Sequence, residues 1–192
     1  MIDLHLHLDG SLVPEEVLQL ALFSGVTLPC HTADTLLPLL EAAPDCQNLG
    51  EYLEKFDLPL QVLQTEDTIS FGVYYLVKRL AAQGLIYAEI RFAPQLHLAR
   101  GLTQEQVVAA AVQGLEKAIA GSGMPAQLIL CCMRSDDNQN ANEETVRVAK
   151  AFLGKGVCAV DLAGNEAAFP TKDFASVFSL AHALGLLFLL TA

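Results

Sequence analysis

Two histidines near the amino terminus, His5 and His7, have the residue type and the spacing of metal ligands. They alternate with leucines, and side chains two positions apart on a strand point to the same face, so both imidazoles would face one way. A neutral imidazole nitrogen binds Zn²⁺ at ~2.0–2.1 Å, and a catalytic zinc site takes three protein ligands and a water. The pair therefore predicts either a metal site that needs at least one more ligand from elsewhere, or two exposed histidines. Asp9 continues the same face into the following loop.

Charged residues also interrupt two other apolar segments. Glu89 and Arg91 lie in segment 85–92, and Asp161 lies in segment 157–163. Buried charges persist only when they are paired. We therefore expect Glu89, Arg91 and Asp161 to form a buried ion network that supports the strands from behind the site. Direct contact with a substrate is the alternative.

Strand-like and helix-like segments alternate along the chain and must position these residues. Residues 2–9 alternate strictly, as in a strand. Pro14 begins a helix that Gly25 ends, and several further helices are expected between residues 34 and 83. The other expected strands are 85–92, 127–134, 157–163 and 186–191, and the other expected helices are 103–120, 142–153 and 171–184. This order predicts an α/β fold with a parallel sheet covered by helices.

The sheet could be doubly wound or could curl into a barrel. The glycine-rich phosphate fingerprint of nucleotide-binding open sheets is absent from the sequence. Polar residues instead mark one face of several strands, as they do in the active site of a (β/α) barrel. We therefore expect an incomplete (β/α)8 TIM barrel with five strands and extra helices between the first two. No shift in composition divides residues 1–192, so we expect a single domain.

Three motifs carry a resemblance to a known family, and they are HLHLDGS at 5–11, YAEIRFAP at 87–94 and DLAGNE at 161–166. In this order they resemble the adenosine deaminase family of the metal-dependent amidohydrolase superfamily. The resemblance spans essentially the whole chain, but only the amino-terminal part of the family's barrel up to the fifth strand. It implies that residues 1–192 are the first part of one TIM-barrel domain, truncated at about that strand.

The resemblance implies a role for four residues. His5 and His7 would bind zinc, and His7 would also lie against the nucleoside. Asp9 would contact the ribose, and the backbone of Gly164 would approach the purine. In the family, zinc makes a water acidic enough to act as hydroxide, which attacks C6 of adenosine or deoxyadenosine and expels ammonia to leave inosine.

The sequence departs from the family pattern at its carboxyl end. The family's third histidine would fall at Thr191 or just beyond Ala192, and neither register supplies it. The glutamate that shuttles protons and the late aspartate ligand are also expected beyond Ala192, so no catalytic residue is assigned within this chain. We therefore expect the 192-residue chain alone not to deaminate adenosine.

Two alternative functions stay open at this point. One is deamination of adenine or of a modified adenine nucleoside, although Asp9 favours a ribose-bearing substrate. The other is a non-catalytic remnant that binds purine or associates with itself. A half barrel has exposed sheet edges, which invite self-association. Hydrophobic residues make up 53% of the chain and charged residues 17%, which suits half of a larger barrel.

Composition excludes several other classes. A net charge of −11 argues against nucleic acid, because phosphate binding needs clustered Lys and Arg. Segment 174–192 has no formal charge, but Ser176, Ser179 and His182 favour a helix and a strand over a membrane span. The five cysteines lack a C-x-x-C spacing, so we expect them to be reduced, as suits a cytoplasmic protein.

Three further histidines are expected to have no part in the chemistry. We expect His31 and His97 to be solvated in loops, and His182 to pack within its helix.

Overall fold

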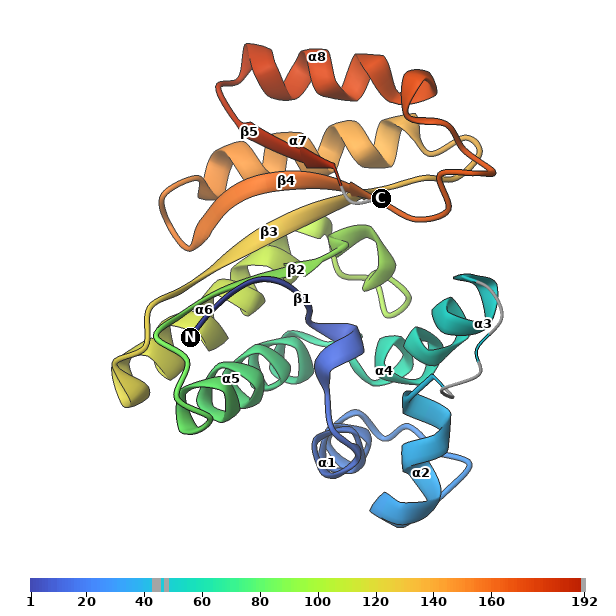
Figure 1. Cartoon of the computed structure of the whole chain (residues 1–192), viewed down its shortest axis with the longest axis vertical. Helices are drawn as coiled ribbons and strands as arrows, with labels where there is room; N and C mark the ends of the chain where they lie inside the picture. The colour runs from blue at the N-terminus through green and yellow to red at the C-terminus, as the bar shows by residue number, and fades with distance from the viewer. Residues whose placement is uncertain (43–45, 47–48, 191–192) are drawn as a thin grey trace.

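A computed structural model describes residues 1–42, 46 and 49–190. Its centre is a sheet of five parallel strands in the order β1-β2-β3-β4-β5. The strands are β1 (Ile2–His7), β2 (Tyr87–Phe92), β3 (Ala126–Met133), β4 (Val157–Ala163) and β5 (Leu187–Leu190). Figure 1 shows the sheet curling, with helices covering its outer side. The expected α/β fold, an incomplete TIM barrel, is confirmed.

Helices follow each of the first four strands, and several of them begin or end at residues suited to those positions. They are α1 (Pro14–Ser24), α2 (Ala33–Leu40), α3 (Leu49–Leu53), α4 (Asp57–Val62), α5 (Glu66–Ala82), α6 (Gln104–Ser122), α7 (Gln139–Phe152) and α8 (Ala175–Ala183). Pro14 stands in the first turn of α1, and Gly25 ends that helix in the left-handed conformation at φ 66°. Short 3₁₀ turns complete the chain at η1 (Asp9–Ser11), η2 (Glu54–Phe56), η3 (Pro94–Leu96) and η4 (Thr171–Phe174).

The extra helices between the first two strands are also confirmed. Helices α1 to α4 lie together beside the carboxyl end of β1, whereas α5 packs along the sheet beside α6 (Figure 1). This group of helices brings α3, η2 and α4 to the end of the sheet where polar side chains gather. In the part of the chain that the structure describes, no helix is long and apolar enough to cross a membrane.

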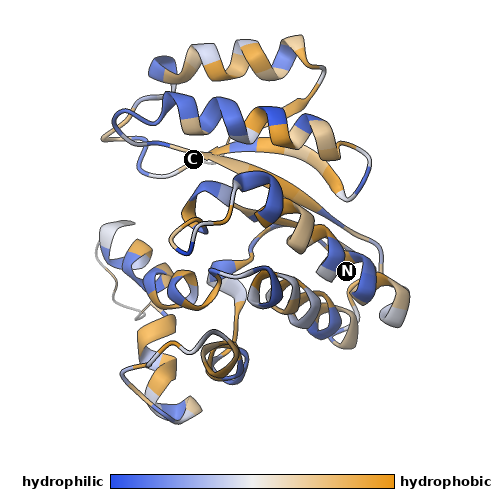
Figure 2. Cartoon of the chain, turned by 180° about the vertical axis from the view of Figure 1, so that it is seen from behind, coloured by the Kyte–Doolittle hydropathy of each residue, from blue (hydrophilic) through white to orange (hydrophobic). Residues whose placement is uncertain are grey.

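The main core lies between the outer face of the sheet and the helices. Ile90, Leu128, Leu130, Val160 and Leu162 are fully buried there, one or two from each central strand. In Figure 2 the strands are largely hydrophobic, while the helices carry hydrophilic residues between hydrophobic ones. Because strand side chains alternate, the residues between these face the hollow of the curled sheet. That inner face holds Arg91, Cys131 and Asp161, among others.

The expected strict alternation of residues 2–9 is only partly correct. Strand β1 ends at His7, and its pairing with β2 shifts by one residue between Asp3 and Leu6. This bulge interrupts the alternation, and Leu4 is 53% exposed whereas Leu6 is 9% exposed. The strand therefore offers a shorter apolar face than the sequence pattern indicates.

Candidate active site

A cavity of about 580 Å³ opens at the carboxyl ends of the strands. His5, His7, Asp9 and Gly164 all line it, although Gly164 comes more than 150 residues after the others along the chain. Parallel strands end at one edge of a sheet, and this shared edge brings residues from β1 and β4 together. The structure thus gathers at one cavity the four residues singled out from the sequence. Their individual roles stay predictions.

His5 and His7 lie side by side, with ring centroids 5.7 Å apart. Because Zn–N bonds are ~2.0–2.1 Å long, two imidazoles on one tetrahedral zinc have ring centres roughly 5 Å apart, so the spacing suits a shared metal. Burial, followed by the charge of Arg91, lowers the pKa of His7 to about 4. The imidazole of His7 is therefore neutral near pH 7, which is the form that binds metals. Across the described ranges, no group of three or more His, Cys, Asp and Glu residues surrounds a point where a metal could bind.

Asp9 is 6% exposed and lies in η1, just past the strand on which its face was expected to continue. Its Oδ1 accepts a hydrogen bond of 3.0 Å from the backbone N–H of Gly10. Burial raises the pKa of Asp9 to about 6. A buried carboxyl at the cavity wall is placed to accept a hydrogen bond from a hydroxyl of a bound molecule.

Gly164 follows β4 with a φ of 112°, a backbone conformation that residues with a side chain rarely adopt. A Cβ atom here would lie 3.2 Å from Cβ of Arg134. The guanidinium of Arg134 binds the loop that follows Gly164, because its Nη1 donates to the carbonyl of Phe169 and its Nη2 to Oγ1 of Thr171, each at 3.0 Å. Buried Arg134 therefore holds the loop that begins at Gly164. The sequence reasoning did not single it out.

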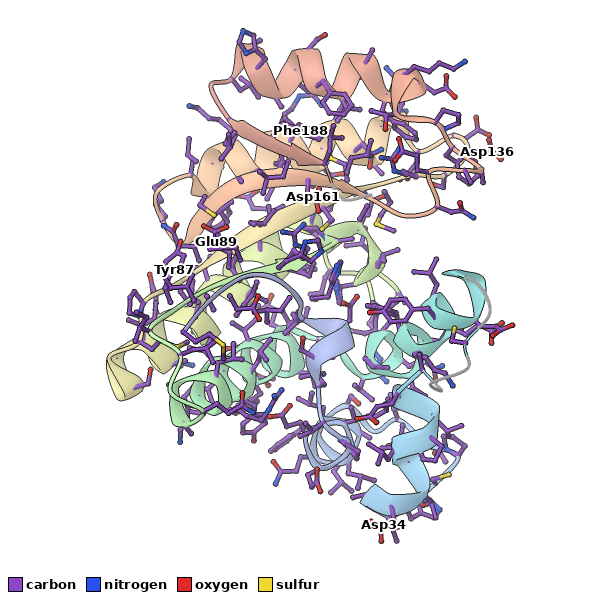
Figure 3. All side chains as sticks on the ribbon, in the orientation of Figure 1. Asp34, Tyr87, Glu89, Asp136, Asp161 and Phe188 are labelled. Carbon is purple, nitrogen blue, oxygen red and sulfur yellow. The ribbon has the colours of Figure 1, made fainter. Side chains whose placement is uncertain are left out.

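The buried charges behind the histidines form one ion pair on the inner face of the sheet. Nη1 of Arg91 lies 2.7 Å from Oδ2 of Asp161, with side-chain exposures of 4% and 0%. Glu89 lies further toward the amino-terminal end of the sheet, where Oη of Tyr87 is 3.0 Å from its Oε1 (Figure 3). Arg91 and Asp161 therefore match the expected paired charges, while Glu89 accepts a hydrogen bond from Tyr87.

The family model for adenosine deaminase matches residues 1–192, which is the whole chain. This chain belongs to the adenosine deaminase family. It is 48% identical over 196 residues to an adenosine deaminase of Haemophilus ducreyi and covers 57% of that protein. The chain thus spans little more than half the length of this curated relative.

Solved structures with the same fold include a deaminase and an amidohydrolase. An adenine deaminase from Arthrobacter aurescens matches with a TM-score of 0.83 at 27% identity, and the match covers all of this chain and 57% of that one. An amidohydrolase from Burkholderia ambifaria, solved with bound zinc, matches with a TM-score of 0.84 at 20% identity and covers 51% of that chain. The curled five-stranded sheet is therefore a barrel fold shared with deaminases.

Other cavity-lining residues of this adenosine deaminase family member went unnoticed in the sequence. Tyr52 and Phe56 come from α3 and η2, and their rings pack edge-on with centroids 5.4 Å apart. Phe56 also meets His7, with ring centroids 5.9 Å apart. Cys131 and Met133 line the cavity from β3. Apolar and aromatic residues of this kind carry no signal that separates a binding wall from ordinary core packing.

Two expectations about the remaining histidines are wrong. His97 is fully buried rather than solvated, because its Nδ1 donates to the carbonyl of Leu63 at 2.7 Å and its ring packs against Phe92. His182 is exposed on α8 rather than packed, whereas His31 is exposed as expected. Thr191, where one register places the family's third histidine, lies outside the described residues.

Proposed function

We propose that residues 1–192 form the amino-terminal part of an adenosine deaminase site that hydrolyses adenosine or deoxyadenosine to inosine and ammonia with the help of zinc. The observation that carries the proposal is the cavity that gathers His5, His7, Asp9 and Gly164 in a chain of this family. Those residues match the family motifs from two distant parts of the sequence. Geometry and family therefore support the same chemistry.

His5 and His7 are the residues that would hold the zinc ion. Bound zinc supplies an acidified water, which can act as a nucleophile near neutral pH. The two imidazoles present a pair of nitrogen donors on one side of the cavity, and the positive charge of Arg91 behind His7 helps to keep that ring neutral. The rest of the metal site and the proton shuttle would come from residues other than those described.

The cavity walls suit a purine nucleoside. Phe56 and Tyr52 offer flat apolar surface for a base, while the absence of a side chain at Gly164 lets a ligand approach the backbone. Asp9 would accept a hydrogen bond from a ribose hydroxyl, and the N–H of Gly10 holds its carboxyl in place. These residues bind and orient the substrate, and none of them moves a proton at the reacting carbon.

Metal binding to the purified 192-residue chain tests the zinc assignment. We expect the chain to bind Zn²⁺ weakly, as monitored by NMR of the imidazole signals. We expect His7→Ala to abolish this binding. His31→Ala is the matched control, because His31 is an exposed histidine outside the cavity and should leave binding unchanged. Binding that survives in a His5→Ala, His7→Ala double variant would refute the assignment.

An assay of turnover tests the proposal that the 192-residue chain does not deaminate adenosine on its own. We expect no release of ammonia from adenosine by the 192-residue chain, because the described residues bring only two of the family's zinc ligands to the cavity. Ammonia release that tracks enzyme concentration and disappears in His7→Ala would overturn this point, while it would support the deaminase assignment itself.

Adenine or a modified adenine nucleoside is the alternative substrate. Its support is the structural match to an adenine deaminase at 27% identity. Asp9 separates the two cases, because a residue that contacts ribose matters only for a nucleoside. We expect Asp9→Ala to weaken binding of adenosine and to leave binding of adenine unchanged. Equal losses for both molecules would argue against a ribose contact.

We also propose that the chain associates with itself through its sheet edges. Ile2 and Leu4 on β1 are 55% and 53% exposed, and Leu187 and Leu190 on β5 are 64% and 59% exposed. Edge strands with exposed apolar residues template further pairing. Sedimentation should show larger species at high protein concentration, and Leu187→Lys should reduce the fraction of the chain in these species. Leu22→Lys, at an 85% exposed position on α1, is the control, and a monomer at all concentrations would refute the proposal.

The remaining expectations about partners and compartment stay proposals. The net charge of −11 and the lack of basic clusters support a small-molecule partner over nucleic acid. Cys30, Cys131, Cys132 and Cys158 carry thiols that are not in disulfides, which supports a reducing compartment such as the cytoplasm. Localisation of a tagged chain by microscopy or by fractionation tests this directly.

A further inference from the structure

Asn142 is a fully buried residue near the start of α7 whose side chain binds the end of strand β3. Its Nδ2 donates to the carbonyl of Met133 at 2.9 Å, and its Oδ1 accepts from the N–H of Met133 at 2.8 Å. Both polar groups of one backbone residue are thus paired with one side-chain amide. A neighbouring strand would provide the same kind of donor and acceptor.

The direction of these bonds shows what the amide replaces. The N–H groups of Leu128 and Arg134 donate to the carbonyls of Gly156 and Ala163, on the β4 side of β3. Backbone groups alternate sides along a strand, so the N–H and carbonyl of Met133 face the β2 side. The pairing of β2 with β3 ends at Phe92 and Leu130. Asn142 therefore occupies the place on β3 that β2 has left.

The same amide also holds the loop that follows β2. Nε2 of Gln95, in η3, donates to Oδ1 of Asn142 at 2.8 Å. Asn138 closes the network, because its Nδ2 donates to Oε1 of Gln95 at 2.6 Å and to the carbonyl of Met133 at 3.2 Å. The loops that follow β2 and β3 are therefore both tied to one buried side chain.

Both tied segments form walls of the cavity. Ala93 and Leu96 line it on either side of Gln95, and Met133 lines it from β3. Asn142 is not among the described residues that line the cavity. We propose that Asn142 is a positioning residue that sets the distance between these two walls and thereby how well a purine nucleoside fits, an inference that rests on the proposed function.

The amide chemistry of Asn142 is what the role needs. An amide is both a donor and an acceptor, and a buried backbone group that loses its partner is strongly disfavoured. Asn142→Leu keeps a similar volume but removes both functions. Asn142→Asp keeps the oxygen that Met133 and Gln95 donate to, and when ionised it lacks the donor for the carbonyl of Met133. The aspartate variant is the milder change should the leucine variant fail to fold.

The matched control is Gln104→Leu in α6. Gln104 is 1% exposed and its amide is also used at both ends, because Nε2 donates to the carbonyl of Ala141 and Oε1 accepts from Thr145. These contacts join α6 to α7 and do not reach Met133. Thr145 also lies 3.5 Å from Nε2 of Gln95, but the shorter bond of 2.8 Å from Gln95 to Asn142 is kept in this variant. Loss of a buried amide therefore affects general stability in both variants, but only the change at Asn142 acts on Met133.

The experiment combines hydrogen exchange, methyl NMR and binding of adenosine to the 192-residue chain. We expect Asn142→Leu to speed exchange of the Met133 amide about tenfold or more, as loss of one hydrogen bond implies, to shift the Met133 methyl signal and to weaken adenosine binding about tenfold. Gln104→Leu should leave all three at wild-type values. Asn142→Asp should show the same changes to a smaller extent.

The outcomes distinguish this inference from the proposed function. Equal effects of Asn142→Leu and Gln104→Leu, or an unchanged Met133 methyl signal in Asn142→Leu, would overturn the positioning role. If the wild-type chain does not bind adenosine, the proposed function loses its support, and the inference about ligand fit fails with it. A selective change at Met133 would then still show that Asn142 holds the wall.

Discussion

Arg91 and Asp161 meet at 2.7 Å although their strands, β2 and β4, are separated by β3. Nη2 of Arg91 also donates to the carbonyl of Leu4 at 3.0 Å, within the bulge of β1. Oδ1 of Asp161 accepts from the N–H of Leu162 at 2.8 Å. The pair thus links β4 to the strand that carries both histidines. It spans the concave inner face on which they lie.

Loss of the carboxylate of Asp161 should destabilise the chain strongly. In Asp161→Ala, Arg91 stays buried without this ion-pair partner, and breaking a buried pair by removing one member costs ~3–5 kcal/mol. Urea unfolding followed by circular dichroism measures the change. Glu143→Ala is the control, because it removes the exposed pair with Arg147, whose side chain is 59% exposed. A solvent-exposed pair of this kind contributes little to stability, and equal losses in both variants would contradict the prediction.

The packing of α5 against α6 depends on a glycine. A Cβ atom at Gly114 would lie 2.1 Å from the carbonyl oxygen of Ser70, whereas a Cβ atom at Gly121 in the same helix meets nothing within 4 Å. Gly114→Ala should therefore push the two helices apart and lower the free energy of unfolding by ~1–3 kcal/mol. Gly121→Ala should raise it by up to ~1 kcal/mol through helix propensity. Thermal melts of both variants check the opposite signs.

The framework of the fold could be predicted from local patterns. Segment 157–163 coincides with β4, and the expected strand 186–191 matches β5 at 187–190, because continuous apolar runs next to glycine have few other places in an α/β fold. The prediction of where β1 ends is less accurate. The apolar and polar alternation of the sequence runs past His7 to Asp9 in η1, and sequence patterns do not show that a bulge will shift the register before His7.

The candidate site divides in the same way. His5, His7, Asp9 and Gly164 belong to motifs, and a parallel sheet brings the ends of such strands together. Arg134 and Asn142 could not be predicted, because their importance depends on which backbone groups lack partners after folding. The sequence distinguishes Asn142 only as an uncharged polar residue on the face of α7 that packs onto β3, and which face that is becomes known only from the fold.

The thiol of Cys131 should be slow to react although it lines the cavity. Burial, followed by the negative charge of Asp161, raises its pKa well above the ordinary value, and only the thiolate is a good nucleophile. At pH 8 we expect iodoacetamide to label half-buried Cys30 well before Cys131, as resolved by peptide mass spectrometry. In Asp161→Ala labelled under folded conditions, Cys131 should react faster. Rapid labelling of Cys131 in the wild-type chain would contradict this account of the inner face.

His97 should make the chain less stable in mild acid. Burial lowers its pKa from 6.5 to about 4, so between these values the unfolded chain takes up a proton that the folded chain does not. Stability contributed by the neutral ring is therefore complete above pH 6.5 and is lost as the pH falls toward 4, by ~3 kcal/mol in total. Asp9, whose pKa is raised to about 6, acts in the opposite direction, because the stability that its protonated carboxyl contributes to the chain is lost as the pH rises.

The comparison of wild type with His97→Asn isolates this contribution. The asparagine amide can still donate to the carbonyl of Leu63 but does not titrate, and the effect of Asp9 is common to both chains. Urea unfolding at a series of pH values should show that the wild-type chain loses stability relative to the variant as the pH falls from 6.5 to 4, with no further divergence below 4. Parallel profiles would mean that His97 is protonated in the folded state, which its burial beside Phe92 argues against.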